Sequence, residues 1–230
     1  MYVFEFFNRS WKQFVTAIIV FGSLFLTFVG FRLINDGNAF SDPWLVLYLF
    51  LGSMLSVAGY PLIFLFERMF NLVSANRLME LCDTNSNKLL TELAHKAPGT
   101  FQHCLQVMNM ADSVASAIGA NVLLARAGAL YHDIGKMMNP LCFIENAPAG
   151  SDYHGNLTPQ ESARDIIKHV SDGLVLADSH SLPQVVKDFI LTHHGTSCTG
   201  YFYNRYLNSG GDPAHTEDFF YRGRKPWTKE

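Results

Sequence analysis

Gly128-Ala-Leu-Tyr-His-Asp-Ile-Gly-Lys136 is the stretch of sequence that decides the fold. His132 and Asp133 are adjacent, follow an apolar helical run and are followed by Gly135 and Lys136. A carboxylate beside an imidazole offers a metal site one bridging oxygen ligand and one nitrogen ligand. Gly135 is expected to end the helix and to let the backbone approach a ligand.

A His-Asp pair alone is common, and its weight here comes from other histidines on predicted helices. His103 lies upstream, and His169 and the pair His193-His194 lie downstream. Each taken alone is as well explained as a structural histidine with a hydrogen-bonded partner. Together, five histidines and an aspartate at the core-facing edges of four helices favour a centre of two transition metals such as Fe, Mn or Zn. Two such ions roughly 3.5–4 Å apart can clamp a phosphodiester.

Composition divides the chain into a membrane segment, residues 1–70, and a soluble domain, residues 71–230. The 230 residues are 49% hydrophobic and 16% charged, and the apolar excess lies in the first third. Net charge is −3 and the only basic cluster is the short Arg222–Lys225, so we expect no binding of a nucleic acid polymer. The four cysteines lack CxxC spacing and are predicted to be free thiols in a reducing compartment: Cys82, Cys104, Cys142 and Cys198.

Two uncharged runs predict two transmembrane helices. They extend from Gln13 to Phe31 and from Pro43 to Phe66, and a helix that crosses a bilayer needs roughly 20 such residues. A cleaved signal peptide is the alternative for the first run. Against it, the sequence has no A-x-A-like cleavage site and a second apolar run follows at once.

The charges beside these runs predict their orientation. Arg9 and Lys12 flank the first run and Arg68 and Arg77 follow the second, whereas the linker has one arginine against two aspartates, Asp36 and Asp42. The positive-inside rule therefore places both ends in the cytoplasm. The linker, with a turn at Asn35-Asp36-Gly37, is short enough only for a tight hairpin.

Residues 71–230 predict an all-α domain. Thr100 is expected to cap a helix that ends near Ala117, Asn121 to cap the next helix, and Thr158 to open a third through a capping box with Glu161. Asp172-Gly173 is expected to bend or interrupt that third helix. Further helices are expected from Pro183 and over Cys198–Leu207.

Helical spacing also predicts where the histidines point. His103, Val107, Met110 and Val114 form one stripe, so His103 is expected to point inward. His193-His194 end a helix at neighbouring positions that diverge by about 100°. An ideal helix would present them to two different metals, although unwinding at Gly195 would relax that limit.

Several longer motifs carry a family resemblance. The chain resembles the HD domain of the PgpH-type seven-transmembrane HD phosphodiesterases, and the likeness extends into the second apolar run. It rests on Ala97–His103, Ile118–Asn121, Leu124–Arg126, Tyr131–Lys136, Phe143–Asn146, His169–Gly173 and His193–Thr196. The fold implied is two transmembrane helices followed by an HD-domain helical bundle.

The resemblance implies hydrolysis of cyclic di-AMP to pApA on a di-iron or di-manganese centre. By this likeness, one metal is bound by His103, His132 and Asp133, and the other by Asp133, His169, His193 and His194. The family thus assigns the last two histidines to one metal, and Asp133 bridges. Lys136 is implied as a catalytic residue that neutralises a substrate phosphate, with an exposed lysine after the end of a helix as the alternative. Arg126 is a second candidate for that contact, with an ion pair as the alternative.

The resemblance also implies that the chain is a fragment. The family continues after Gly223-Arg-Lys-Pro226 into a helix with a final metal-binding aspartate, and this chain ends at Glu230. Weak metal binding and low activity are therefore expected. The expected location is the bacterial cytoplasmic membrane, crossed more than once, with the HD domain facing the cytoplasm.

Two other functions stay open at this level. The domain is either an enzyme, or a catalytically silent module that binds a cyclic nucleotide and relays a signal, or an HD phosphohydrolase that acts on another nucleotide. The expected partners are a cyclic dinucleotide and the lipid bilayer. Whether the domain forms a homodimer is left open.

Overall fold

The computed structural model describes residues 2–35, 43–70, 72–226 and 228–230. The chain divides into two compact units, Met1–Leu72 and Val73–Glu230. Residues 36–42, with most of the predicted hairpin turn and its two aspartates, lie outside the described residues. So do the side chains of Arg9, Lys12 and Arg68, on which the predicted orientation depends.

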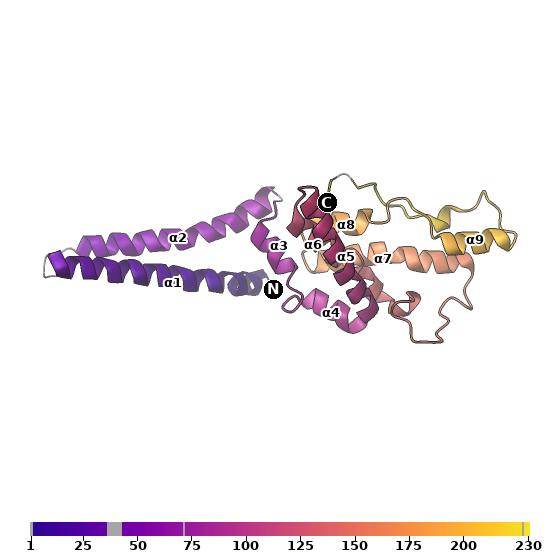
Figure 1. Ribbon diagram of the computed structural model, residues 1–230, viewed down its shortest axis with the longest axis horizontal. Coiled ribbons are helices and arrows are strands. Elements are labelled where there is room, and N and C mark those ends of the chain that lie inside the picture. Colours follow the sequence, from indigo (N-terminus) through magenta and orange to yellow (C-terminus); the bar gives the residue numbers. More distant parts are fainter. Residues whose placement is uncertain (1, 36–42, 71, 227) are drawn as a thin grey trace. The chain divides into compact units, whose positions relative to one another are not determined.

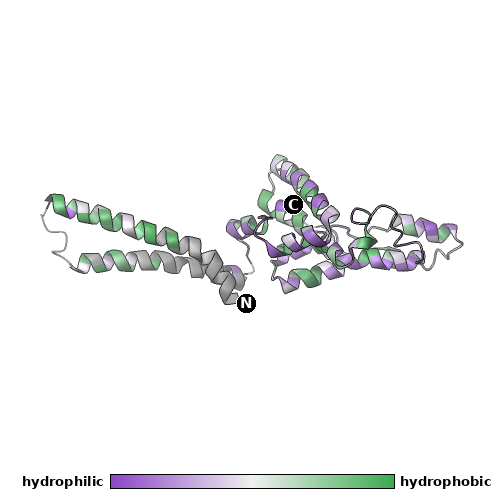
Figure 2. Cartoon of the chain, turned by 90° about the horizontal axis from the view of Figure 1, so that it is seen from below, coloured by the Kyte–Doolittle hydropathy of each residue, from purple (hydrophilic) through white to green (hydrophobic). Residues whose placement is uncertain are grey.

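The first unit consists of two long helices, α1 (Tyr2–Asn35) and α2 (Pro43–Phe70), which lie side by side (Figure 1). The rings of Phe21 and Phe50 meet edge to face between them, with centroids 5.9 Å apart. Apolar residues dominate the described part of both helices (Figure 2). Among the described residues, one helix is long and apolar enough to cross a membrane, namely α1 over Ile18–Asn35 with a mean hydropathy of 1.9.

The second unit is built from helices, and the all-α prediction is confirmed. In chain order they are α3 (Ala75–Leu81), α4 (Lys88–Lys96), α5 (Pro98–Ala117), α6 (Val122–Tyr131), the short 3-10 helices η1 (Ile134–Met138) and η2 (Pro140–Cys142), α7 (Pro159–Ser179), α8 (Gln184–Thr192), α9 (Gly200–Asn208) and η3 (Glu217–Phe219). In the described part of the chain, extended pairing is limited to one antiparallel bridge between Cys198 and Phe220.

Local capping explains where two of these helices begin. The Asn121 side chain accepts a hydrogen bond from the backbone N–H of Leu124 at 3.1 Å, and Thr158 and Glu161 form the predicted capping box. The prediction for Thr100 was wrong. The N-cap is Ala97, three residues before Thr100, and helix α5 begins at Pro98. Proline is well suited to this first position, which needs no backbone donor.

Helix α6 is the central element of the domain. Its residues from Ala127 to Tyr131 are buried, and it packs against α5 and α8. Gly128 allows the contact with α8, because a β-carbon there would lie 2.3 Å from the Phe189 ring. The Tyr131 hydroxyl donates to the carbonyl of Leu81 at 2.9 Å, so even the polar end of this buried ring is satisfied.

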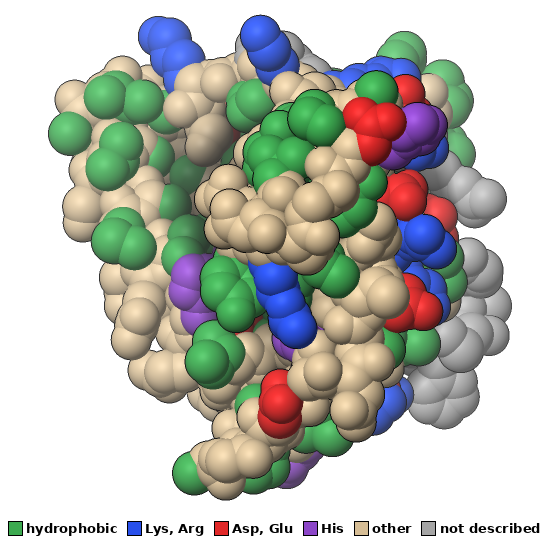
Figure 3. Space-filling view, turned by 90° about the vertical axis from the view of Figure 1, so that its right-hand side faces the viewer, with side chains coloured by type: hydrophobic (Ala, Val, Ile, Leu, Met, Phe, Trp, Pro, Cys, Tyr) green, Lys and Arg blue, Asp and Glu red, His purple; other side chains and the backbone are tan. Residues whose placement is uncertain are grey.

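The predicted inward stripe on α5 was wrong. Met110 and Val114 are 61% and 59% exposed, and the buried positions of this helix are Thr100, Cys104 and Ala115. Helix α5 has apolar residues on both faces, so spacing alone does not identify the face that packs. Exposed hydrophobic side chains also lie among charged ones on the face drawn in Figure 3.

Helix α7 is continuous, so the predicted interruption at Asp172-Gly173 was also wrong. Gly173 is buried, and a β-carbon there would lie 2.9 Å from Cγ2 of Ile190 on α8. The glycine is therefore explained by close packing of α7 rather than by a break in the helix.

Candidate metal centre

The sequence His132-Asp133 lies where α6 gives way to η1. Helix α6 ends at Tyr131, and Asp133 has φ −110° and ψ 14°, outside the α-helical values. Gly135 then brings η1 against α7, because a β-carbon there would lie 1.9 Å from the carbonyl oxygen of His169. Its φ is not in the left-handed region. The prediction that Gly135 ends the helix was therefore wrong, because α6 ends at Tyr131 and Gly135 lies within η1. The approach of a ligand to this backbone stays a prediction.

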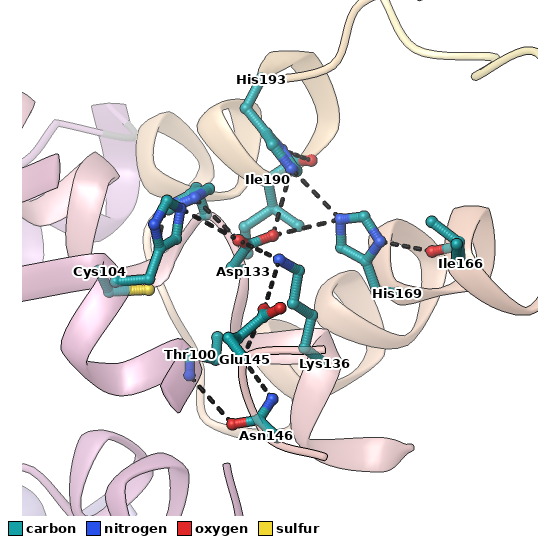
Figure 4. Close-up of polar contacts among 12 residues, drawn as sticks. Thr100, Cys104, Asp133, Lys136, Glu145, Asn146, Ile166, His169, Ile190 and His193 are labelled. Carbon is teal, nitrogen blue, oxygen red and sulfur yellow. Dashed lines mark hydrogen bonds and ion pairs between the residues drawn. The ribbon is translucent and has the colours of Figure 1, made fainter. Parts of the chain in front are cut away.

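The carboxylate of Asp133 lies between two groups of histidines (Figure 4). Its Oδ2 is 3.0 Å from Nε2 of His132 and 3.7 Å from Nε2 of His103. Its Oδ1 is 3.3 Å from Nε2 of His169 and 3.5 Å from Nε2 of His193. Each oxygen thus faces a different group, the arrangement that a bridging carboxylate needs.

The candidate ligand atoms converge tightly. Within each group, the nitrogen and oxygen atoms lie within 4.8 Å of one another. One group is His103, His132 and Asp133, and the other is Asp133, His169, His193 and His194. The structure therefore brings together all six residues that the sequence analysis singled out as ligands.

Hydrogen bonding fixes which ring nitrogens face inward. The Nδ1 atoms of His132, His169 and His193 lie 2.8, 2.6 and 2.9 Å from the carbonyl oxygen of the residue three positions earlier. A carbonyl only accepts, so Nδ1 carries the proton and a neutral ring presents an Nε2 lone pair. The Nε2 atoms of His169 and His193 lie 3.3 Å apart.

These inward lone pairs fit a cation. They converge on a carboxylate that is 2% exposed, and Oδ1 of Asp133 has no hydrogen-bond partner among the described residues. On the Oδ1 side of Asp133, buried acceptors face one another without a donor, which is destabilising. The donor set of imidazole nitrogens and one carboxylate suits a divalent transition metal. A metal-binding histidine usually donates its other ring N–H to a carbonyl or carboxylate that orients the ring, and the Nδ1 contacts to backbone carbonyls are of this kind.

The end of α8 explains how His193 and His194 reach the same group. The helix stops at Thr192, and Gly195 adopts a left-handed φ of 55°, which glycine tolerates best. The two rings have centroids only 4.1 Å apart. The limit set by an ideal helix does not apply, because His194 lies beyond the helix.

Burial favours the neutral form of three of these histidines. Burial lowers the pKa of His103 and His193, and burial with the neighbouring imidazoles lowers the pKa of His194 to about 3. Burial would raise the pKa of Asp133, but its histidine neighbours hold it well below the ordinary range. Burial also opposes protonation of His132, yet the hydrogen bond to Asp133 raises its pKa to about 10.

Lys136 belongs to the same cluster. Its Nζ lies 2.9 Å from Oδ2 of Asp133 and 3.0 Å from Oε1 of Glu145, and 4.9 Å from the centre of the Phe143 ring. Burial would lower the pKa of this lysine, but the two carboxylates outweigh burial and raise it. Lys136 therefore holds a positive charge beside Asp133.

Glu145 lies within the motif Phe143–Asn146 but was not among the predicted site residues. Its side chain accepts a hydrogen bond from the Thr100 hydroxyl at 3.2 Å, and the Asn146 amide exchanges two hydrogen bonds with Thr100. A β-carbon at Gly99 would lie 1.8 Å from the Glu145 carbonyl oxygen. These contacts hold the loop that carries Glu145 against the start of α5. The loop's path depends on tertiary packing, so local pattern gave no signal for it.

Arg126 lies on α6 in an ion pair with Asp112 of α5, at 3.3 Å. This is the structural alternative that the sequence left open, and substrate contact by Arg126 stays a prediction. The four cysteines are free thiols, as predicted. Cys104 is buried, with its sulfur 4.0 Å from Nδ1 of His132.

Comparison with known proteins agrees with this geometry. The family model for the HD domain matches residues 100–217. The cyclic-di-AMP phosphodiesterase PgpH of Listeria monocytogenes is 41% identical over 184 residues, which are 80% of this chain and 25% of that protein. The protein of the same name from Bacillus subtilis is 39% identical over 181 residues, 79% of this chain and 25% of that one.

A solved structure is similar as well. The crystal structure of the Listeria PgpH HD domain in complex with cyclic-di-AMP is 41% identical, with a TM-score of 0.60. The match covers 63% of this chain and 67% of that one.

The fold and the site define an HD-domain protein, and the chain belongs to the HD domain family. Within that family, the resemblance to PgpH-type proteins is confirmed. The chain spans about a quarter of the length of the curated relatives that it matches.

Proposed function

We propose that residues 71–230 form a metal-dependent phosphodiesterase domain that hydrolyses cyclic di-AMP to pApA. The observation that carries the proposal is the position of Asp133, whose two oxygens face separate groups of histidines. The names of the Listeria and Bacillus relatives and the cyclic-di-AMP complex of the Listeria domain support the choice of substrate.

The proposed centre holds two divalent ions, with Fe or Mn preferred. His103 and His132 would hold one ion, His169, His193 and His194 would hold the other, and Asp133 would be shared by both. When bound, two such ions polarise the phosphodiester and make water nucleophilic at neutral pH.

The chain's own residues prepare this site for an anion. The Asp133 carboxylate lies between the two histidine groups. Hydrogen bonds from the Nδ1 atoms to backbone carbonyls hold the rings of His132, His169 and His193 in place. The Lys136 ammonium lies at the same point, only 14% exposed, where a positive charge stabilises the negative charge on a reacting phosphate. Glu145 keeps that ammonium in position from the opposite side.

Two alternatives make different predictions. A silent signalling module would bind cyclic di-AMP without turnover, and a phosphohydrolase of another specificity would hydrolyse a different nucleotide. The pairing of two histidine groups around one buried carboxylate favours catalysis, because binding a nucleotide requires no such centre.

The direct test is turnover by the purified full chain in detergent, loaded with Mn²⁺ or Fe²⁺. We expect slow conversion of cyclic di-AMP to pApA, loss of this product in His132→Ala, and its retention in His215→Ala. His215 is the matched control because its side chain is 80% exposed and pairs only with Asp212 among the described residues. Binding of cyclic di-AMP with no product from metal-loaded protein would instead support the signalling module.

The first unit is proposed to be a multi-pass anchor in the bacterial cytoplasmic membrane, with α1 and α2 as its two spans and the HD domain in the cytoplasm. The apolar stretch of α1 supports the first span. Protease added to inverted membrane vesicles should digest the HD domain, whereas intact spheroplasts should protect it. Protection in inverted vesicles would contradict the orientation.

A further inference from the structure

A cavity of about 430 Å³ lies beside the proposed metal centre, between α7, the end of α8 and residues 217–223. Its apolar lining comes from all three elements and includes Ile167, Val170 and Leu174 of α7, Leu191 of α8, and Phe220. Pockets that bind small molecules have volumes in this range and are mostly apolar, with a few polar groups.

The wall formed by residues 217–223 is held firmly to the rest of the domain. The backbone N–H of Tyr221 donates to the carbonyl of Ser197 at 2.9 Å, and that of Gly223 donates to the carbonyl of Gly195 at 3.0 Å. A β-carbon at Gly223 would lie 2.6 Å from the Gly195 oxygen. The cavity is therefore bounded by a wall that backbone hydrogen bonds hold in place.

Charge at the cavity favours an anion. Arg164 pairs with Asp218 at 3.2 Å, which joins α7 to the wall. Lys168 and Arg222 also line the cavity, and no ion pair to either is found within the described residues. Glu217 lines the cavity as well, so its apolar walls carry three cationic side chains, Arg164, Lys168 and Arg222, against the two carboxylates of Glu217 and Asp218. The excess of positive charge favours an anion.

The cavity and the metal centre share His194. This histidine lines the cavity and is also a member of the second ligand group. The ring of Tyr221 lines the cavity too and stacks on the His194 ring, with centroids 4.0 Å apart. A molecule held at the metal centre through a phosphate can therefore extend past His194 into the cavity.

We infer that this cavity is a subsite for one nucleoside monophosphate half of the dinucleotide. The base packs against the apolar walls, and the phosphate of this half faces Lys168 and Arg222. The inference rests on the proposed function and deepens it, since it gives a binding site to the half of the substrate that does not react.

Two substrates separate the cavity from the metal centre. Cyclic di-AMP carries nucleosides, whereas bis(4-nitrophenyl) phosphate is a phosphodiester without them. The measured quantity is the ratio of kcat/KM for cyclic di-AMP to kcat/KM for the small diester. A variant that damages the metal centre lowers both values, whereas a variant that blocks the subsite lowers the ratio.

Ser171→Trp is the filling variant, because Ser171 is exposed on α7 and lines the cavity. Val175→Trp is its matched control, one turn further along the same helix, 67% exposed and outside the cavity lining. We expect Ser171→Trp to lower the ratio at least about fivefold through a higher KM for cyclic di-AMP, and Val175→Trp to leave it unchanged.

A charge variant tests the same subsite without added bulk. Lys168→Glu should lower the ratio in the same direction, and Arg205→Glu on the exposed surface of α9 serves as its control. Turnover of cyclic di-AMP with an unchanged ratio in both cavity variants would overturn the inference alone. Wild-type protein that does not hydrolyse cyclic di-AMP would overturn the proposed function and this inference with it.

Discussion

Gly135 and His169 meet backbone to backbone, so closely that a β-carbon at Gly135 would lie 1.9 Å from the His169 carbonyl oxygen. The same β-carbon would lie 2.5 Å from the backbone nitrogen of Gly173. This contact sets η1 against α7 and so fixes the position of the His169 ring relative to Asp133, two residues before Gly135. The contacts of Gly135 with His169 and Gly173 therefore help to set the geometry of the candidate metal centre.

Replacing Gly135 with alanine should destabilise the domain by about 3 kcal/mol, the upper end of the usual range for overpacked sites, because backbone atoms cannot move aside as a flexible side chain can. Gly200→Ala is the control, since a β-carbon there has no neighbour within 4 Å. Chemical denaturation followed by circular dichroism measures both. Equal stability of the two variants would show that α7 shifts without cost.

The same contact explains why Asp172-Gly173 was misread as a helix break. The start of α7 was predicted correctly, because the capping box depends on residues three positions apart, Thr158 and Glu161. Gly173 is needed for packing against Ile190 and Gly135, which are distant in sequence. Local sequence patterns reveal a capping box, but they do not reveal packing between residues that are far apart in the chain.

In the candidate metal centre too, some residues could be predicted from local sequence and others could not. Its histidines and Asp133 were found from residue type and helical spacing, and the structure brings them together. Glu145 and Tyr221 were not assigned to the site. Glu145 reaches it through a loop whose path depends on contacts with Thr100, and Tyr221 reaches it through backbone pairing with residues near Ser197. Neither path has a periodic pattern.

Glu145→Gln should lower stability by about 1 kcal/mol at pH 7, because a partly buried charged hydrogen bond to Lys136 is lost. Burial would raise the pKa of Glu145, but Lys136 outweighs it and lowers this pKa below the ordinary 4.5. A lowered folded pKa contributes stability that is present above the unfolded value. The difference from wild type should therefore be constant above about pH 4.5 and disappear as the pH falls through the folded pKa.

Urea denaturation of both proteins between pH 3 and 8 measures this difference. Glu92→Gln is the matched control, since Glu92 pairs with Lys96 on the surface at 2.7 Å. A solvent-exposed pair of this kind contributes little, so its loss should change stability much less. A Glu145→Gln effect that persists unchanged at pH 3 would contradict the role assigned to its charge.

Metal content should follow the division of ligands around Asp133. Asp133→Asn should lose both ions, because the carboxylate faces both histidine groups. His103→Ala should lose mainly one, because His103 belongs to a single group. Elemental analysis of protein purified from metal-supplemented cells gives the stoichiometry, with His215→Ala as the control. Two ions retained in Asp133→Asn would contradict the bridging role.

Tyr221 should orient His194 through ring stacking alone. The two rings are nearly parallel, at 20°, with centroids 4.0 Å apart. Tyr221→Ala should weaken binding of the ion assigned to His169, His193 and His194 roughly tenfold. This is the lower end of the usual effect of removing a group that positions a metal ligand. Tyr221→Phe should bind nearly as wild type, since the ring remains, and Tyr201→Ala, at a position 72% exposed on α9, should have no effect. Stepwise Mn²⁺ titration separates the two sites, and equal weakening in the Phe and Ala variants would assign the role to the hydroxyl instead.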